Sequence, residues 1–182
     1  VVLFLIRNAL GVQQMPPNLV LYGIALVLTV YVTTPLLSEM TGRLQEGQVQ
    51  FQTTDDLARA AQLVREPLQQ HLIKFTQPEE RQFFLDGTNR LWPEQARQNL
   101  KDDDLSILVP AFVASELTRA FEIGFLLYLP FLIIDIVVAN LLMTLGMIMV
   151  SPVLISIPLK LFLFVAIDGW SRLMHGLILS YV

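Results

Sequence analysis

The longest apolar stretch of the chain lies in its last third. Between residues 123 and 167 only two side chains are charged, Asp135 and Lys160. A helix on the surface of a soluble protein needs a polar face toward water, and this stretch has none. A bilayer, or the interior of a large apolar assembly, removes that need. We therefore predict a hydrophobic helical hairpin over residues 110–182, with its apex at residues 146–152 and a return helix over residues 153–179.

A second apolar region lies at the start of the chain. Residues 1–6 are apolar and residues 19–37 carry no charge. The latter run is about long enough, at ~1.5 Å per helical residue, to cross a hydrocarbon core of ~30 Å. Glycine and proline between the runs break regular helix, and Asn18 suits an N-cap. We predict an apolar hairpin over residues 1–37, and we expect a segment before Val1 because the chain begins inside an apolar run.

Residues 38–109 form the polar part of the chain. Thr54 followed by two aspartates is typical of a helix start, because acidic side chains favour the positive end of the helix dipole. Pro67 is expected to interrupt or kink this helix, and the prolines at 78 and 93 predict two more helix starts. Pro110 is expected to open the helix that enters the C-terminal hairpin. Apolar residues at three- and four-residue spacing mark the buried face of the first helix: Leu57, Ala61, Val64, Leu68, Leu72 and Phe75.

The predicted fold is therefore all-α, with two hydrophobic hairpins flanking a small polar insert in a membrane-derived oligomeric assembly. The composition agrees, because 54% of the 182 residues are apolar and the mean hydropathy is +0.57. The net charge is −4, and residues 38–122 carry fourteen acidic against nine basic side chains. By the positive-inside rule, this acidic middle is expected on the exported, periplasmic side, with both ends facing the cytoplasm.

Several function classes lack their sequence features here. There is no cysteine, and His71 and His175 are far apart without a ligand-like neighbour, so we expect no metal and no cofactor. The aspartates at 102–104 are typical of a solvated loop and lack the further ligands of a calcium loop. The chain has no basic patch, so we do not expect nucleic acid as a partner. Phosphate-binding and nucleophile motifs are absent, so we predict a protein that is not an enzyme.

Four segments together match one known family: RNALGVQQMPPN (residues 7–18), PAFVASELTRAFEIGFLLYLPFLIID (110–135), GMIMVSPVLISIPLKL (146–161) and DGWSRLMHGLILSY (168–181). They resemble the FliP/SctR family, the core export-gate subunit of type III secretion systems. The resemblance covers almost the whole chain. The residues after Arg7 and after the apex are more similar to the virulence injectisome branch than to the flagellar one.

The resemblance implies a pentamer that joins FliQ/SctS-like and FliR/SctT-like subunits, with an FlhB/SctU-like switch subunit. It implies a conduit for unfolded secretion substrates in the bacterial inner membrane. The energy for export would come from a separate ATPase and the proton motive force.

The predicted apex carries Met147, Ile148 and Met149. Methionine is flexible and polarizable, so a ring of such side chains can close a pore and reshape around a passing chain. From the residues alone, packing of the hairpin turn is the favoured interpretation, and a pore seal is the alternative. The resemblance favours a pore seal, although the family's usual triple methionine has the stiffer isoleucine at its centre here.

Asp135 and Lys160 lie at similar distances before and after the apex. In antiparallel helices they fall at similar depth, about 18–20 Å below it. Charges in apolar surroundings persist when they are paired, so we predict an ion pair within one subunit or between neighbours. A proton relay is the alternative. If Asp135→Asn abolishes export but leaves assembly intact, the relay is favoured.

Three further charges share one face of the helix that enters the hairpin. Glu116, Arg119 and Glu122 recur every three residues, so they can pair locally or between subunits. Farther on, Pro158, Lys160 and Asp168 leave no charge-free span of the length that a bilayer needs. We therefore expect the return helix to pack mainly on other protein chains.

Two other functions are alternatives to a conduit. An intramembrane aspartyl protease would pair Asp135 with Asp168 around a shared proton, but their flanking residues do not resemble that class. A secondary transporter usually has an internal repeat, and the two hairpins share no sequence pattern.

Overall fold

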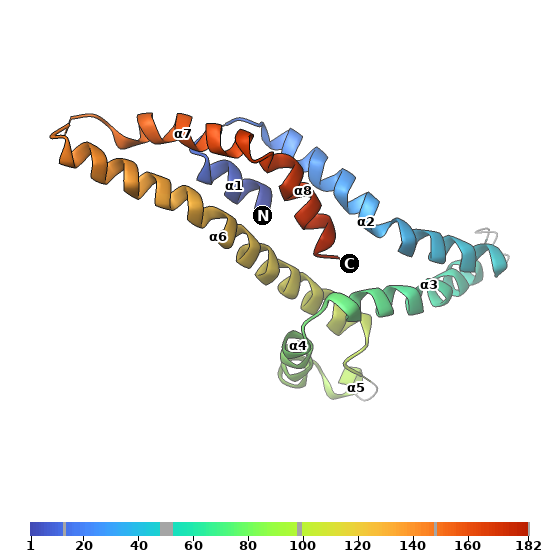
Figure 1. Cartoon of the computed structure of the whole chain (residues 1–182). Coiled ribbons are helices and arrows are strands. Elements are labelled where there is room, and N and C mark those ends of the chain that lie inside the picture. The colour runs from blue at the N-terminus through green and yellow to red at the C-terminus, as the bar shows by residue number, and fades with distance from the viewer. Residues whose placement is uncertain (13, 48–52, 98–99, 148, 182) are drawn as a thin grey trace. The chain divides into compact units, whose positions relative to one another are not determined.

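The computed structural model describes residues 1–12, 14–47, 53–97, 100–147 and 149–181. All regular structure in these ranges is helical, which confirms the predicted all-α class. The eight helices described are shown in Figure 1: α1 (Val2–Ala9), α2 (Asn18–Glu46), α3 (Thr54–Phe75), α4 (Pro78–Leu91), α5 (Glu94–Arg97), α6 (Leu105–Thr144), α7 (Pro152–Ala166) and α8 (Gly169–Leu179).

Two helices are long and apolar enough to cross a membrane. They are α2, with 29 residues, and α6, with 40 residues. Only 6% of the most apolar window of α2 and 17% of that of α6 are buried within the chain. The bent pair α7 and α8 would add a third span if it crosses as one unit. The chain is a membrane protein whose longest helices leave most of their apolar surface uncovered.

The chain divides into two compact units. The first consists of Val1–Thr29 together with Arg119–Val182, and the second is Val30–Thr118. Helices α2 and α6 each contribute to both units. The boundaries of the two hairpins and of the insert, at residues 37 and 110, stay predictions.

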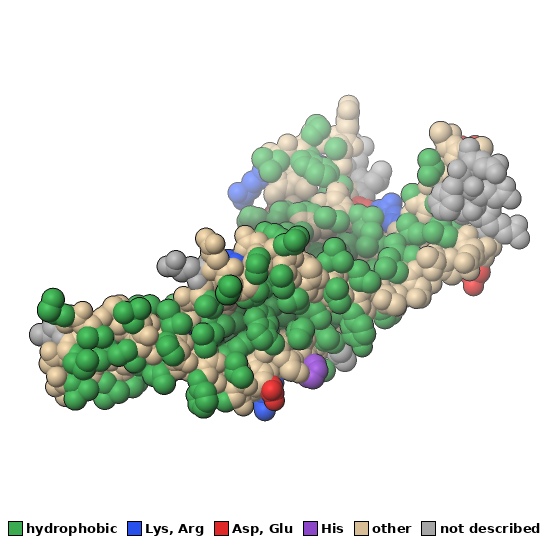
Figure 2. All heavy atoms as spheres, turned by 90° about the horizontal axis from the view of Figure 1, so that it is seen from above, with side chains coloured by type: hydrophobic (Ala, Val, Ile, Leu, Met, Phe, Trp, Pro, Cys, Tyr) green, Lys and Arg blue, Asp and Glu red, His purple; other side chains and the backbone are tan. Residues whose placement is uncertain are grey.

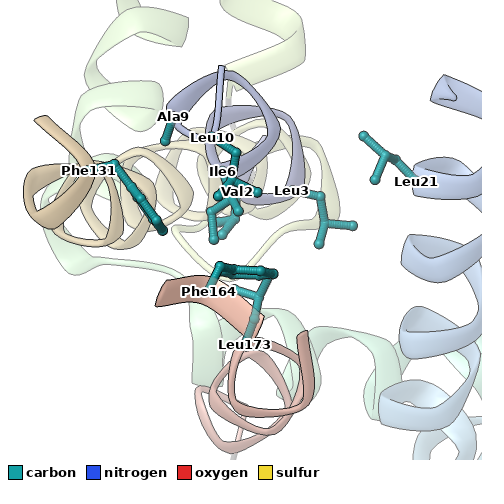
Figure 3. Close-up of a cluster of buried hydrophobic side chains, with 9 residues drawn as sticks. All are labelled: Val2, Leu3, Ile6, Ala9, Leu10, Leu21, Phe131, Phe164 and Leu173. Atoms are coloured by element: carbon teal, nitrogen blue, oxygen red, sulfur yellow. The ribbon is translucent and has the colours of Figure 1, made fainter. Parts of the chain in front are cut away.

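Helix α1 forms the centre of the first unit. Its Ile6 is 2% exposed and packs in a cluster with Phe131 of α6, Phe164 of α7 and Leu173 of α8 (Figure 3). The rings of Phe131 and Phe164 lie 6.2 Å apart. Helix α1 approaches α6 closely at Gly124, because any Cβ there would collide with the side chain of Leu5. The buried face of a short apolar helix thus joins three later helices.

The second unit is held partly by ion pairs. Helix α3 begins with a capping box, in which Thr53 and Asp56 exchange hydrogen bonds of 3.1 and 3.2 Å. The sequence suggested that the aspartates at 102–104 form a solvated loop, but two of them form ion pairs. Asp104 lies 2.6 Å from Arg65 of α3 and Asp102 lies 3.6 Å from Arg81 of α4. The run therefore fastens two helices of the polar part to the segment before α6.

Two predicted helix features differ from the structure. Helix α3 continues through Pro67, so this residue does not interrupt it. Helix α6 begins at Leu105, not at Pro110, because the backbone carbonyl of Asp104 accepts hydrogen bonds from Ile107 and Leu108 and starts the helix earlier. Pro110 thus lies inside the helix, where it lacks the N–H for a backbone hydrogen bond and its ring crowds the carbonyl one turn earlier.

The predicted continuous return helix is wrong. It breaks after α7, and α7 and α8 meet at an angle of 62°. Asp168 at the break has φ of 52°, the left-handed conformation that ends a helix. Gly169 follows because a Cβ there would collide with the ring of Phe164. We call residues 167–169 the elbow.

Candidate functional site

The loop between α6 and α7 begins with a defined helix stop. Gly146 has φ of +74° and follows α6, which ends at Thr144. Its N–H donates to the carbonyl of Met143 at 3.0 Å, and the N–H of Met147 donates to the carbonyl of Leu142 at 2.9 Å. Two hydrogen bonds with this spacing around a left-handed glycine form a Schellman motif. The backbone on the α6 side of the apex is therefore fixed.

The far side of the loop begins a helix in an equally regular way. Ser151 is the N-cap of α7 and Pro152 its first residue, a position where a missing N–H costs nothing. Between these ends, Met147 is 42% exposed and Met149 is 100% exposed. The predicted seal residue Ile148 lies outside the described residues. The fixed ends of this loop thus present two methionine side chains away from the chain's own core.

The two predicted membrane charges lie close together. Lys160 Nζ is 2.5 Å from Asp135 Oδ2, and it also donates to the backbone carbonyl of Ala9 at 3.0 Å. The Lys160 side chain is 6% exposed, whereas that of Asp135 is 36% exposed. One ammonium therefore joins the end of α1 to both arms of the hairpin. We call Asp135, Lys160 and the Ala9 carbonyl the lysine node.

Sequence reasoning missed the third member of this node. Ala9 contributes a backbone carbonyl at the last residue of α1, where carbonyls lack a partner within the helix. A cation favours the negative end of a helix dipole. Lys160 therefore stabilises the C-terminal end of α1 in addition to pairing with Asp135. The only sequence signal for it is the end of an apolar helix before Gly11.

One residue on the charged face of α6 contacts the end of α8. Arg119 Nη1 donates to the backbone carbonyl of Ser180, the C-cap of α8, at 3.4 Å. Glu116 is half-buried and Glu122 is exposed. Arg119 thus takes part in closing the first unit, and the pairing of these residues between subunits stays a prediction.

Large apolar side chains cover the outside of the hairpin. Figure 2 shows hydrophobic side chains spread over the visible face, with few charged ones among them. A soluble monomer rarely exposes so large a patch. The most exposed on these helices and their loop include Phe125, Leu126, Ile133, Leu141, Met143, Leu145, Leu154, Phe162 and Val165.

Neither histidine belongs to the lysine node, and the elbow aspartate does not belong to it either. No cluster of three or more possible metal ligands occurs in the part of the chain that the structure describes. His71 is half-buried on α3 with its ring 5.0 Å from that of Phe75, and burial lowers its pKa, with a smaller contribution from the charge of Lys74. His175 on α8 and Asp168 at the elbow are exposed.

Comparison with known proteins identifies the family. The FliP family model matches residues 1–177. The chain is 58% identical to the "Probable translocation protein y4yL" of Sinorhizobium fredii, over all of this chain and 82% of that protein. It is 49% identical to the "Yop proteins translocation protein R" of Yersinia pestis, over all of this chain and 83% of that protein. It is 48% identical to the "Hypersensitivity response secretion protein HrcR" of Ralstonia nicotianae, over all of this chain and 84% of that protein.

These matches cover both apolar regions and the polar part between them. They run through the apex, the lysine node and the elbow, so the whole site belongs to the matched region. The predicted family is thereby confirmed: this chain is a member of the FliP family.

Proposed function

We propose that this chain is a non-enzymatic subunit of a type III secretion export gate, a conduit for unfolded protein substrates in the bacterial inner membrane. The observation that carries the proposal is the similarity, over the full length of this chain, to proteins named for translocation or secretion. Those names include Yop proteins and the hypersensitivity response, which favours the injectisome branch over the flagellar one.

The uncovered apolar faces support an assembly of several chains. Helix α6 continues for 40 residues with little of its most apolar window buried. Lys160 and Asp168 interrupt the return arm, so that arm suits protein neighbours better than lipid. We infer a pentamer that packs against FliQ/SctS-like and FliR/SctT-like subunits and an FlhB/SctU-like switch subunit. The acidic polar part would lie on the periplasmic side.

The apex loop would form the seal of this conduit. Met149 is fully exposed and Met147 nearly half exposed, so neither is needed to pack the hairpin turn of a single chain. Copies arranged around an axis would bring these flexible side chains together, with Ile148 between them. Such a ring would limit leakage while yielding to a polypeptide.

The aspartyl protease alternative is disfavoured by the lysine node. Two catalytic aspartates must share one proton, whereas Asp135 faces the ammonium of Lys160 at 2.5 Å. Asp168 is exposed at the elbow and is not part of the node.

The proposal is tested by expressing this chain together with its three candidate partner subunits. The complex would be purified in detergent and its native mass measured. We expect a stable assembly that contains five copies of this chain. A stable lone monomer, especially one that cleaves membrane peptides, would overturn the proposal.

A further inference from the structure

An apolar cavity of about 430 Å³ lies in the first unit, beside the elbow. Its floor is formed by core residues, namely Ile6, Phe131, Phe164 and Leu173. Figure 3 shows Ile6 of α1, Phe131 of α6 and Phe164 of α7, whose side chains converge. Cavities of ~300–1,000 Å³ with mainly apolar walls are typical of small-molecule sites.

The mouth of the cavity continues into the exposed apolar surface. Leu126 is 65% exposed and Ile167 is 45% exposed, and both line the cavity. The cavity is therefore open toward whatever surrounds the hairpin, which for a membrane protein includes lipid. A whole helix, about 10–12 Å across with its side chains, is too wide to enter a space of this volume.

One cation stands at this apolar mouth. Arg172 of α8 lines the cavity and is exposed. Among the described residues, no carboxylate lies within ion-pair distance of the Arg172 guanidinium. This holds also for Asp168, which lies one helical turn earlier. Guanidinium binds phosphate in a bidentate manner, and such charge-assisted hydrogen bonds are stronger than neutral ones.

We propose that this cavity binds one acyl chain of an anionic phospholipid of the surrounding membrane, whose phosphate pairs with Arg172. Arg172 is the only cation among the described residues that line the cavity. An apolar slot with a cation at its mouth matches a molecule with an aliphatic tail and an anionic head. The site does not depend on the export function, since it lies within one unit of one chain. Bound lipid would fill the space beside the elbow and hold α7 and α8 at their angle.

Gly176 provides a variant that fills the cavity. It lines the cavity, and a Cβ added there meets nothing within 4 Å, so Gly176→Leu adds a side chain without a backbone clash. Gly23 of α2 also has nothing within 4 Å and does not line the cavity, so Gly23→Leu is the matched control. Arg172→Gln removes the cation alone, and Arg90→Gln on α4 removes an exposed arginine elsewhere.

The test uses the complete complex, purified from membranes and examined by native mass spectrometry with added phosphatidylglycerol or phosphatidylethanolamine. We expect one retained phospholipid per copy of this chain, with several-fold preference for phosphatidylglycerol. Gly176→Leu should abolish retention, and Gly23→Leu should not. Arg172→Gln should remove the preference, and Arg90→Gln should preserve it.

A photoreactive residue at Leu126 provides a second readout that does not require Gly176→Leu to fold. We expect it to label phospholipid in membranes. Labelling of a second copy of this chain or of another subunit, without lipid, would overturn the proposal. Equal retention in Gly176→Leu and the unaltered chain, or retention without preference for the anionic lipid, would also overturn it.

Discussion

Folding brings Lys160 into contact with distant parts of the sequence. Its ammonium is almost fully buried and donates hydrogen bonds to the Asp135 carboxylate and the Ala9 backbone carbonyl. The sequence predicted the pairing of two charges in an apolar stretch, because an isolated charge there is costly. It could not predict Ala9, since every residue has a carbonyl and only the fold decides which one lies nearby.

Lys160→Met should destabilise the assembled protein by about 3 kcal/mol, because it leaves the Asp135 carboxylate without its partner. This value lies at the low end for buried pairs, since the Asp135 side chain keeps 36% exposure. Thermal unfolding of the purified complex measures the loss. Lys101→Met, an exposed lysine in the polar part, is the control and should change little. Equal melting temperatures for the two variants would contradict a structural role for the node.

Asp135→Asn separates the structural pair from a proton relay. If the node is structural, the neutral amide weakens the contact with Lys160, and the amount of assembled complex falls together with export. Native gel electrophoresis and a secretion assay measure the two quantities in the same cells. Normal assembly with abolished export would instead support the relay.

His71 gives the polar part a modest dependence on pH. Burial lowers its pKa, so the folded chain binds its proton less readily than the unfolded chain does. Stability is therefore unaffected above the ordinary pKa of ~6.5 and falls as the pH drops below it. Melting temperatures measured between pH 8 and 5 should decline, and the decline should be smaller in His71→Gln. An identical decline in the variant would show that other groups cause it.

The elbow between α7 and α8 is the element that sequence patterns described least well. The mainly apolar run over residues 153–179 predicted one return helix. Pro158, Lys160 and Asp168 indicated only that it contains no charge-free span long enough for a bilayer. The break depends on the left-handed Asp168 and on the contact between Gly169 and the ring of Phe164. Such a contact between residues five apart exists only after the chain has turned.

Gly169→Ala and Gly176→Ala form a matched pair within α8. A Cβ at 169 collides with the buried Phe164 ring, whereas a Cβ at 176 meets open space. Gly169→Ala should therefore lower stability by about 1–3 kcal/mol, as overpacked sites do. Gly176→Ala should raise stability by about 0.5–1 kcal/mol, because glycine is a poor helix residue. Thermal unfolding compares them, and a stabilising Gly169→Ala would refute the description of the elbow.

The apex loop is the second element with a distinct expectation. Met149 is fully exposed, so Met149→Ala should leave thermal stability within about 0.5 kcal/mol of the unaltered protein. If it belongs to a seal, leakage of small solutes through the inner membrane should rise. Met143→Ala, at an exposed position on α6, is the control for both measurements. A large loss of stability without leakage would favour the turn-packing interpretation.

At the scale of the whole molecule, composition and hydropathy were enough to predict an all-α membrane protein. Long apolar runs leave few other ways to satisfy backbone hydrogen bonds. The ends of the helices were less predictable, because Asp104 and Asp168 act through backbone geometry and not through hydrophobic spacing. A single sequence does not show what covers the apolar faces, and only the family resemblance indicates that other subunits do so.

We propose that other subunits, and not lipid alone, cover the outer face of the hairpin. Photoreactive residues at Ile136, Leu141, Leu154 and Phe162 test it most directly, because all four are exposed and none lines the apolar cavity. In membranes that contain the complete complex, we predict cross-links from most of these positions to a second copy or to a partner subunit. Cross-links to lipid alone at all four positions would contradict the claim.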